Sequence, residues 1–341
     1  MAALGLVAAI GCTGPDPAEP KPTLVRFEGA VMGTTYHVSV VQRTSGARLQ
    51  AAAETAVAGA LTAVDDAMTT WRESEVTRFN AMPSDSPFAL SPETAEVVGL
   101  ALELGVETDG ALDVTVAPLV NAMGFGPAPP ADSPSVDELE AMRESIGHDH
   151  LTLSTDGTLT KDRAQTQLDL SALAKGYGVD RAALALDAIG AIDYMVEVGG
   201  EVRARGRNEQ GHAWRIGVEV PGGQPGAAVQ RIVPLLDMSM ATSGDYRNFR
   251  HVGDERISHI FDPRTGRTTT GSVASATVLA ADCATADGLA TAMMVLGAEG
   301  LALAEEREWA VLLLMRTDDG LVERRSSSFD RLLESATEAH S

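Results

Sequence analysis

Residues 285–297 read Thr-Ala-Asp-Gly-Leu-Ala-Thr-Ala-Met-Met-Val-Leu-Gly and carry the clearest signal in this 341-residue chain. Apolar residues at helical spacing, closed by Gly297, predict a helix that ends at that glycine. Asp287 and Thr291 are four residues apart and are therefore expected on one face of it. A carboxylate beside a hydroxyl suits a hard cation such as Mg²⁺, which binds a few protein oxygens together with waters and substrate phosphate. The alternative for this segment alone is a capping Asp and a Thr bonded back to its own helix.

The rest of the chain reads as helices and strands around this segment. Alternating and apolar runs predict strands at 24–29, 34–41, 194–198, 201–205, 214–220, 238–242, 257–261, 274–280 and 309–316. Helical spacing predicts helices at 48–69, 91–108, 136–146 and 171–189, with a loop at 124–134 and a hairpin that turns at Asp156-Gly157.

The order of these elements predicts the fold class. The strands from 194 onward, with 214–220 and 257–261 among them, are expected to form one sheet that 309–316 closes. No repeat of fixed period and no Pro/Ser-rich linker divides the body. The sequence therefore predicts an α+β fold, a single interwoven domain of mixed/antiparallel sheet with flanking helices over 24–325, followed by a C-terminal tail at 326–341.

Composition bounds the class of protein. Hydrophobic residues make up 44% of the chain and aromatic residues 4%, so a mainly aliphatic core is expected and a disordered chain is excluded. The 48 acidic and 26 basic residues give a net charge of −22. Such a charge repels nucleic acid and anionic lipid, so no nucleic-acid partner is expected. Cys283 is in no metal-ligand spacing and is expected to be a small buried residue.

The N-terminus resembles a bacterial lipoprotein signal. An apolar run over residues 2–11 ends at Cys12, and a Pro-, Glu- and Lys-containing segment follows to Pro22. No Lys or Arg precedes the run, and Ala9 stands where such signals usually have Leu. We expect residues 1–23 to be a signal and tether and Cys12 to carry lipid as the sole membrane contact, because the run is too short to span a bilayer. The alternative is a cytoplasmic protein with a frayed apolar terminus.

Residues 169–177, Asp-Leu-Ser-Ala-Leu-Ala-Lys-Gly-Tyr, place Asp169 near the positive end of a predicted helix and Lys175 about two turns into it. An ion pair between the two is the simplest alternative, but their separation is not the i,i+4 spacing that brings side chains together. Gly176 permits a close approach of backbone. We therefore expect Lys175 to bind an anionic ligand.

Three further segments carry polar groups that a plain core does not need. The small, polar turn at 241–247 offers backbone N–H groups of the kind that bind phosphate or carboxylate, although such turns are common in ordinary loops. His259 precedes a Pro/Gly turn and is either a core histidine or a base at a strand end. Asp113 lies in an apolar run and needs a partner if it is buried.

A serine acyltransferase of the penicillin-recognising type is a rival reading that spacing excludes. Such an enzyme needs Ser-x-x-Lys and a Lys-Thr-Gly-like strand. Arg264-Thr265-Gly266 imitates the second motif, but three residues rather than two separate Ser171 from Lys175. The sequence contains no Walker A, HExxH or GxGxxG motif either.

Taken in chain order, these segments resemble the ApbE-type flavin transferases, the FAD:protein FMN transferases. The matching motifs are Met32-Gly33-Thr34; Trp71-Arg72, Ser74-Glu75 and Arg78-Phe79-Asn80; Asp113 to Pro118 with Gly124-Phe125-Gly126; Asp169-Leu170-Ser171 through Lys175-Gly176-Tyr177; Val198-Gly199-Gly200; Ala241 to Tyr246; His259 with Asp262 to Gly266; and Ala286-Asp287 with Thr291. The resemblance spans residues 24–325, and eight motifs in the family's order are far more specific than any one of them.

The resemblance implies a role for individual residues. It implies FAD contacts at Met32, Trp71, Ala111, Leu112, Asp113, Asp169, Lys175 and Phe261. It implies Mg²⁺ ligands at Asp287, Thr291 and the backbone carbonyl of Ala172, and it makes His259 the base that deprotonates the acceptor. Asp287 and His259 are thus the implied catalytic residues. The family more often has Tyr at position 71, and an indole stacks on a flavin as well.

Three positions depart from the family's pattern. Glu197 stands where Asn is expected, Glu201 stands where Asp is usual, and Ala290 occupies a position that carries an acid in some relatives. We expect the chemistry to survive these changes and the metal affinity to fall.

The implied reaction is Mg²⁺-dependent transfer of FMN from FAD, the substrate, to a Thr hydroxyl of a target protein, with release of AMP. The family's acceptors are flavoprotein subunits of Na⁺-translocating NADH:quinone reductase and Rnf-type complexes, so a lipid-anchored protein on the periplasmic side of the cell membrane is expected. Two alternatives stay open: an FAD pyrophosphatase that yields FMN and AMP, and a non-catalytic FAD-binding lipoprotein. Lys175, His259, Asp287 and Thr291 argue against the second, because a pure binder needs no base.

Overall fold

The computed structural model describes residues 22–43, 48–127, 135–222, 229–245, 249–252, 255–269 and 271–338. The predicted lipid-bearing Cys12 and nearly all of the 1–23 tether lie outside these ranges, as do Tyr246 and most of the predicted loop at 124–134.

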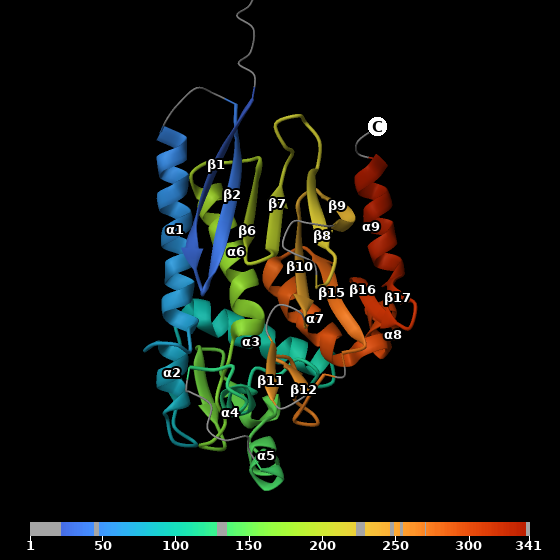
Figure 1. The fold of residues 1–341 in the computed structure, drawn as a ribbon. Helices are drawn as coiled ribbons and strands as arrows, with labels where there is room; N and C mark the ends of the chain where they lie inside the picture. The colour runs from blue at the N-terminus through green and yellow to red at the C-terminus, as the bar shows by residue number, and fades with distance from the viewer. Residues whose placement is uncertain are drawn as a thin grey trace, which may run out of the picture.

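Within these ranges, eight strands form one antiparallel sheet in the order β1-β2-β6-β7-β10-β15-β16-β17 (Figure 1). The strands are β1 (Thr23–Val31), β2 (Thr34–Gln42), β6 (Tyr194–Val198), β7 (Glu201–Arg205), β10 (Met238–Gly244), β15 (Val273–Ala280), β16 (Ala310–Thr317) and β17 (Gly320–Arg325). The mixed α+β class with an antiparallel sheet is confirmed.

The sheet is covered on both faces, as the sequence of β16 shows. Val311 and Leu313 point into a core shared with helix α7 (Cys283–Leu296), whereas Leu312 and Leu314 point into a second core. Side chains alternate along a strand, so an uninterrupted apolar run marks a strand buried on both sides. Helices α1 (Arg48–Met68) and α6 (Ser171–Ala188) extend the first layer, and the second consists of the ribbon β8–β9 (Trp214–Glu219, Val229–Leu235) and α9 (Ser327–Glu338).

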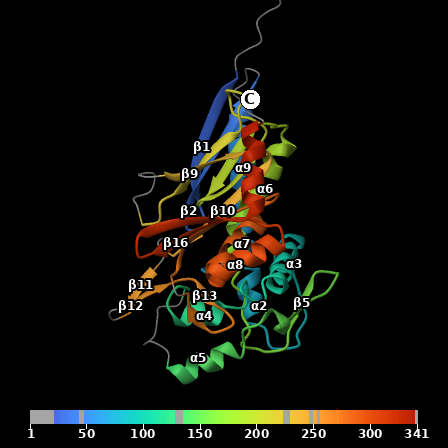
Figure 2. The same ribbon diagram turned by 90° about the vertical axis from the view of Figure 1, so that its right-hand side faces the viewer.

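The remaining elements gather mainly at the end of the molecule opposite the C-terminus, where α5 and the β11–β12 ribbon lie in both views (Figure 1, Figure 2). They are α2 (Glu75–Asn80), β3 (Phe88–Ala89), α3 (Pro92–Glu107), α4 (Ala117–Ala122), α5 (Val136–Arg143), η1 (His148–His150), β4 (Leu151–Leu153), β5 (Thr158–Lys161), β11 (Phe249–Val252), β12 (Glu255–Ser258), β13 (Phe261–Asp262), β14 (Arg267–Thr268), η2 (Gly297–Glu299) and α8 (Gly300–Glu306). The small sheet β3-β5-β4 contains the predicted hairpin.

Several details of the predicted sheet are wrong. Residues 214–220 and 257–261 do not continue the main sheet, because β8 pairs with β9 and β12 pairs with β11. The strand predicted at 309–316 does not close the sheet either, since β17 pairs with β16 beyond it. The residues predicted as a tail include α9, whose Phe329 is fully buried against the second core. Alternation predicts a strand but does not tell which neighbour it pairs with.

Helix α7 is the central helix of the first layer. It packs against α6, β10 and β15 and ends at Gly297, as predicted, with a φ of 67° that favours glycine. Together with α8 it forms a stretch, Cys283–Glu306, that is long and apolar enough to cross a membrane by length and composition alone. Half of an apolar 18-residue segment of this stretch is buried inside the protein, so we interpret the stretch as an element of the core.

Asp180 fixes where α7 begins. Its carboxylate, which comes from α6, accepts hydrogen bonds from the backbone N–H groups of Cys283 and Ala284 at 2.8 and 2.9 Å and pairs with Arg203 at 2.5 Å. Asp180→Ala would leave two helix N–H groups and a half-buried guanidinium unpaired. We expect the free energy of unfolding to fall by about 3 kcal/mol. Urea unfolding measures this, and Asp282→Ala, which removes only the N-cap of the same helix, should cost about 1 kcal/mol. Equal losses would contradict this role of Asp180.

Candidate active site

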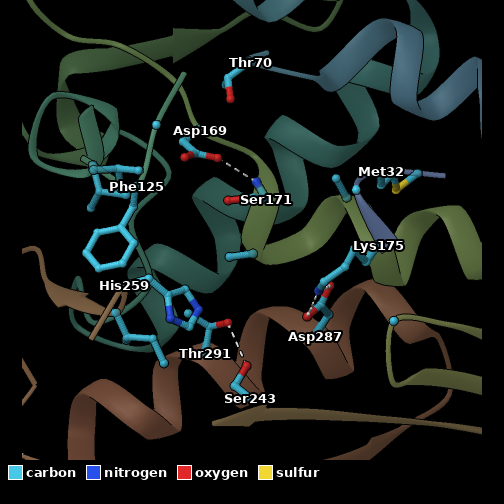
Figure 3. A pocket seen from close by; sticks show the side chains of 18 of the residues that line it. Met32, Thr70, Phe125, Asp169, Ser171, Lys175, Ser243, His259, Asp287 and Thr291 are labelled. Carbon is cyan, nitrogen blue, oxygen red and sulfur yellow. Dashed lines mark hydrogen bonds and ion pairs between the residues drawn. The ribbon is translucent and has the colours of Figure 1, made fainter. Parts of the chain in front are cut away.

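One large cavity of about 980 Å³ opens between the helix-covered sheet and the elements at the α5 end. Every predicted site residue that the structure describes lines it: Met32, Trp71, Ala111, Leu112, Asp113, Asp169, Ala172, Lys175, His259, Phe261, Asp287 and Thr291. Figure 3 shows the labelled members of this set around the pocket, from segments that lie far apart in the sequence. The structure thus brings the whole predicted set together.

Lys175, Asp287 and Glu201 form a buried charge cluster at one side of the cavity. Lys175 Nζ lies 3.1 Å from Glu201 Oε1. It also lies 3.4 Å from both carboxylate oxygens of Asp287, as Figure 3 shows. Oδ2 of Asp287 also accepts a hydrogen bond from the backbone N–H of Gly176 at 3.0 Å. Asp287 is only 1% exposed, so its charge depends on these partners.

Burial and pairing act against each other on the pKa values of the cluster. Burial alone would lower the pKa of Lys175, but the Asp287 and Glu201 carboxylates outweigh burial and raise it, so the ammonium stays charged. Burial raises the pKa of Glu201 to about 8, although Lys175 opposes that shift. Burial also raises the pKa of Asp287 against the effect of Lys175 and the Gly176 N–H.

Oxygen donors next to this cluster fit a hard cation. Asp287 and Thr291 lie one turn apart on α7, and Thr291 Oγ1 is 3.1 Å from the hydroxyl of Ser243 on β10. Among the described residues no three His, Cys, Asp or Glu side chains gather as metal ligands. A cation here would therefore have one carboxylate and neutral oxygens, which matches Mg²⁺ because it retains waters and binds substrate phosphates. The surplus of carboxylates over ammonium in the cluster favours such a cation.

His259 lies in an aromatic part of the wall. The ring of Phe125 is 6.2 Å from the His259 ring and 6.0 Å from the Phe261 ring. Arg250 of β11 donates hydrogen bonds to the carbonyls of Met123 and Gly124 at 3.3 and 2.9 Å, which ties the ribbon to the loop that carries Phe125. The ribbon and the loop of Phe125 are thereby joined beside His259.

Met32 and Trp71 lie at other parts of the cavity. Met32 and Gly33 have φ values of 50° and 70°, as in a type I′ turn between β1 and β2, and this turn brings Met32 to the cavity. The Trp71 side chain is 68% exposed, so a large aromatic surface is available beside the cavity.

Asp113 and Asp169 shape the loops that surround the cavity. Asp113 Oδ1 accepts hydrogen bonds from Thr115 at 2.8 and 2.5 Å, and Oδ2 accepts one from the backbone N–H of His148 at 2.7 Å. These are the partners that the sequence required of a buried Asp. The Asp113 carboxylate, as acceptor for the His148 imidazole, raises the pKa of His148 against the effect of burial. Asp169 Oδ1 accepts from the backbone N–H of Ser171 at 2.9 Å, at the start of α6, as predicted.

The structure confirms one local expectation and corrects another. Gly176 permits a close approach of backbone, as expected, and the approaching segment is α7: a Cβ there would lie 2.3 Å from the carbonyl oxygen of Cys283. Residues 241–244 are not a phosphate-binding turn, because they belong to β10 and pair with β15. Asp245 follows the strand and forms an ion pair with Arg316 at 2.7 Å.

The structure explains one departure from the family's pattern and adds residues that sequence reasoning did not assign. Glu197 Oε1 accepts a hydrogen bond from the Gly200 N–H at 2.6 Å, as the side-chain oxygen of the expected Asn could. Ser243, Arg250 and Glu201 line the cavity without having been predicted as site residues. The sequence could have indicated Glu201 as a site residue, since it directly follows the Gly199-Gly200 turn in one of the recognised motifs.

The fold and this cavity define a class of α+β protein in which a large cavity opens over a buried Lys–carboxylate cluster. The ApbE family model matches residues 32–313, and the chain belongs to the ApbE family. It is 45% identical to an FAD:protein FMN transferase of Vibrio cholerae over 98% of both chains, and 38% identical to one of Haemophilus influenzae over 97% of both.

Solved structures agree with this assignment. The flavin transferase ApbE from Vibrio cholerae superposes with a TM-score of 0.82 at 44% identity, covering 91% of this chain and 99% of that one. The apo flavinyl transferase ApbE of Pseudomonas stutzeri gives a TM-score of 0.83 at 37% identity, with coverages of 92% and 97%. The resemblance found from motifs is confirmed along nearly the whole body.

Proposed function

We propose that this chain is an FAD:protein FMN transferase that moves FMN from FAD to a Thr hydroxyl of a target protein and releases AMP. The observation that carries the proposal is the convergence of Lys175, Asp287, Thr291 and His259 on one cavity of about 980 Å³. The family membership and the names of the relatives support the same activity.

In this proposal some side chains bind FAD and another transfers a proton. Lys175 would hold the FAD pyrophosphate by its ammonium, which its two carboxylates keep charged. His259 would accept the proton of the acceptor hydroxyl as that oxygen attacks the FMN-side phosphorus. The phosphoanhydride bond to AMP breaks, AMP leaves, and a phosphoester to the protein forms. Phe125 and Phe261 form an aromatic wall on this side of the cavity, and we expect this wall to limit the access of water.

The metal site would comprise Asp287, Thr291 and the carbonyl of Ala172. Mg²⁺ bound there would supply charge neutralisation at the pyrophosphate. Asp287 is held in place by the Gly176 N–H, and Thr291 by the hydroxyl of Ser243.

The acceptor would be a flavoprotein subunit of a Na⁺-translocating NADH:quinone reductase or an Rnf-type complex. Lipid attachment at Cys12 would hold the enzyme on the periplasmic side of the cell membrane. The support for this location is the apolar run that ends at Cys12. Radiolabelled palmitate incorporation that is lost in Cys12→Ser, in cells that express the full chain, tests it.

His259→Ala separates the base from the binding residues. We expect FMN transfer to fall by about 10²–10⁴-fold, because general-base catalysis contributes that much, while FAD affinity changes little. Transfer is measured by in-gel flavin fluorescence of the acceptor, and FAD affinity by quenching of FAD fluorescence. His37→Ala, on the exposed part of β2, is the control and should transfer normally. Normal transfer by His259→Ala would rule out the proposed base.

A further inference from the structure

Lys175 lies between two buried carboxylates, although one ammonium needs only one counter-charge. The side chains of Glu201 and Asp287 are 3% and 2% exposed, against 30% for Lys175. When all three are charged, the cluster carries one surplus negative charge in a buried place. Such a surplus is unfavourable unless a further cation or a proton joins the cluster.

The two carboxylates are held differently. Asp287 is bound by Lys175 and by the Gly176 N–H, and its helix also carries Thr291. Glu201 is the first residue of β7 and pairs with Val198 of β6 across the Gly199-Gly200 turn, so its backbone is fixed by the sheet. Its Oε1 contacts Lys175, and its buried Oε2 accepts no hydrogen bond from the described residues. Of the two, Glu201 is also the nearer to the ammonium, at 3.1 Å against 3.4 Å.

We propose that Glu201 is a positioning residue that holds the Lys175 ammonium while Asp287 binds Mg²⁺. The inference rests on the proposed function, because it takes Asp287 as the ligand of the cation. A lysine paired with Asp287 alone competes with the cation for the same oxygens. A lysine that Glu201 also holds stays ordered when Asp287 binds the cation, and it remains available to the FAD pyrophosphate. Residues that orient a ligand in this way typically change metal affinity about 10–100-fold.

Calorimetric titration of MgCl₂ into the full chain without FAD tests the inference apart from activity. We expect Glu201→Gln to weaken Mg²⁺ binding about tenfold, because Lys175 then pairs with Asp287 alone. Glu201→Asp keeps the charge, is shorter by one methylene, and should bind closer to the wild type than Glu201→Gln does. Glu28→Gln removes the same charge from a side chain that is 77% exposed and should change nothing. Thermal unfolding of each variant verifies the fold.

A double-mutant cycle distinguishes positioning through Lys175 from a direct effect on the cation. In a Lys175→Met background, Glu201→Gln should change Mg²⁺ affinity by less than about twofold, because the group it acts through is gone. The same tenfold loss in both backgrounds would overturn the inference, and so would equal affinity of Glu201→Gln and the wild type. If the wild type itself bound no Mg²⁺, the proposed metal site would fail and this inference with it.

Discussion

Asp287→Asn is expected to lower FMN transfer by about a thousandfold or more, because it removes the carboxylate that we propose binds the cation beside the pyrophosphate. The Asn side chain has the same shape, and its carbonyl oxygen can still accept the hydrogen bond that Gly176 donates to Asp287. Lys175 retains Glu201 as its counter-charge. The fold should therefore survive, and the loss should appear in catalysis and in Mg²⁺ binding.

The matched control is Asp282→Asn on the same helix. Asp282 is the N-cap of α7 and accepts a hydrogen bond from the Thr285 N–H at 2.8 Å, which Asn also does well. It does not line the cavity. Transfer measured by in-gel flavin fluorescence should be normal in this variant and absent in Asp287→Asn. Comparable transfer by the two variants would show that Asp287 has no special place in the reaction.

Gly176→Ala should damage both stability and activity, because it separates the two helices that carry Lys175 and Asp287. An added Cβ would lie 2.3 Å from the Cys283 carbonyl oxygen and 2.8 Å from Cβ of Asp287. One of these contacts is with backbone, so the helices must move apart. We expect the free energy of unfolding to fall by about 2–3 kcal/mol. Transfer should fall about a hundredfold, as misplacement of a catalytic group by about 1 Å can cost.

Gly59→Ala provides the comparison for this prediction. Gly59 lies within α1, and an added Cβ there meets nothing within 4 Å. Alanine is the better helix former, so this variant should gain about 0.5–1 kcal/mol in unfolding free energy and keep full activity. Urea unfolding and the transfer assay measure both. Wild-type stability and activity in Gly176→Ala would contradict the close packing of α6 on α7.

The sequence predicted the elements better than it predicted their pairing. The helices that became α1, α3, α6 and α7 were predicted from local signals, namely the spacing of apolar residues and, for α3 and α7, residues at the helix ends, and they are correct to within a few residues. Strands β8 and β12 pair in small ribbons and not in the predicted sheet, because pairing is decided by contacts between distant segments. The packing of α9 was missed for the same reason, since its buried Phe329 is recognisable only once β16 is in place.

At the candidate site, too, features that depend on local sequence were predicted and contacts between distant segments were not. The family resemblance, found from motifs in chain order, identified the residues that line the cavity. Lys175, Asp287 and His259 also stand out as polar groups that a core does not need, whereas apolar residues such as Met32 and Phe261 followed from the resemblance alone. The counter-charge of Lys175 could not be predicted, because Glu201 is brought to it by the turn between β6 and β7. The close backbone approach at Gly176 was predicted, but the sequence alone could not show that α7 is the neighbour.

The transfer of FMN to a protein Thr, which we propose for this chain, can be measured directly. Purified protein should be incubated with FAD, Mg²⁺ and a peptide that carries a candidate acceptor Thr, and the products weighed by mass spectrometry. We expect a peptide heavier by one FMN and an equal amount of AMP, with neither product formed by Asp287→Asn. Free FMN and AMP beside unmodified peptide would contradict transfer and favour a pyrophosphatase, and intact FAD would leave a binding protein.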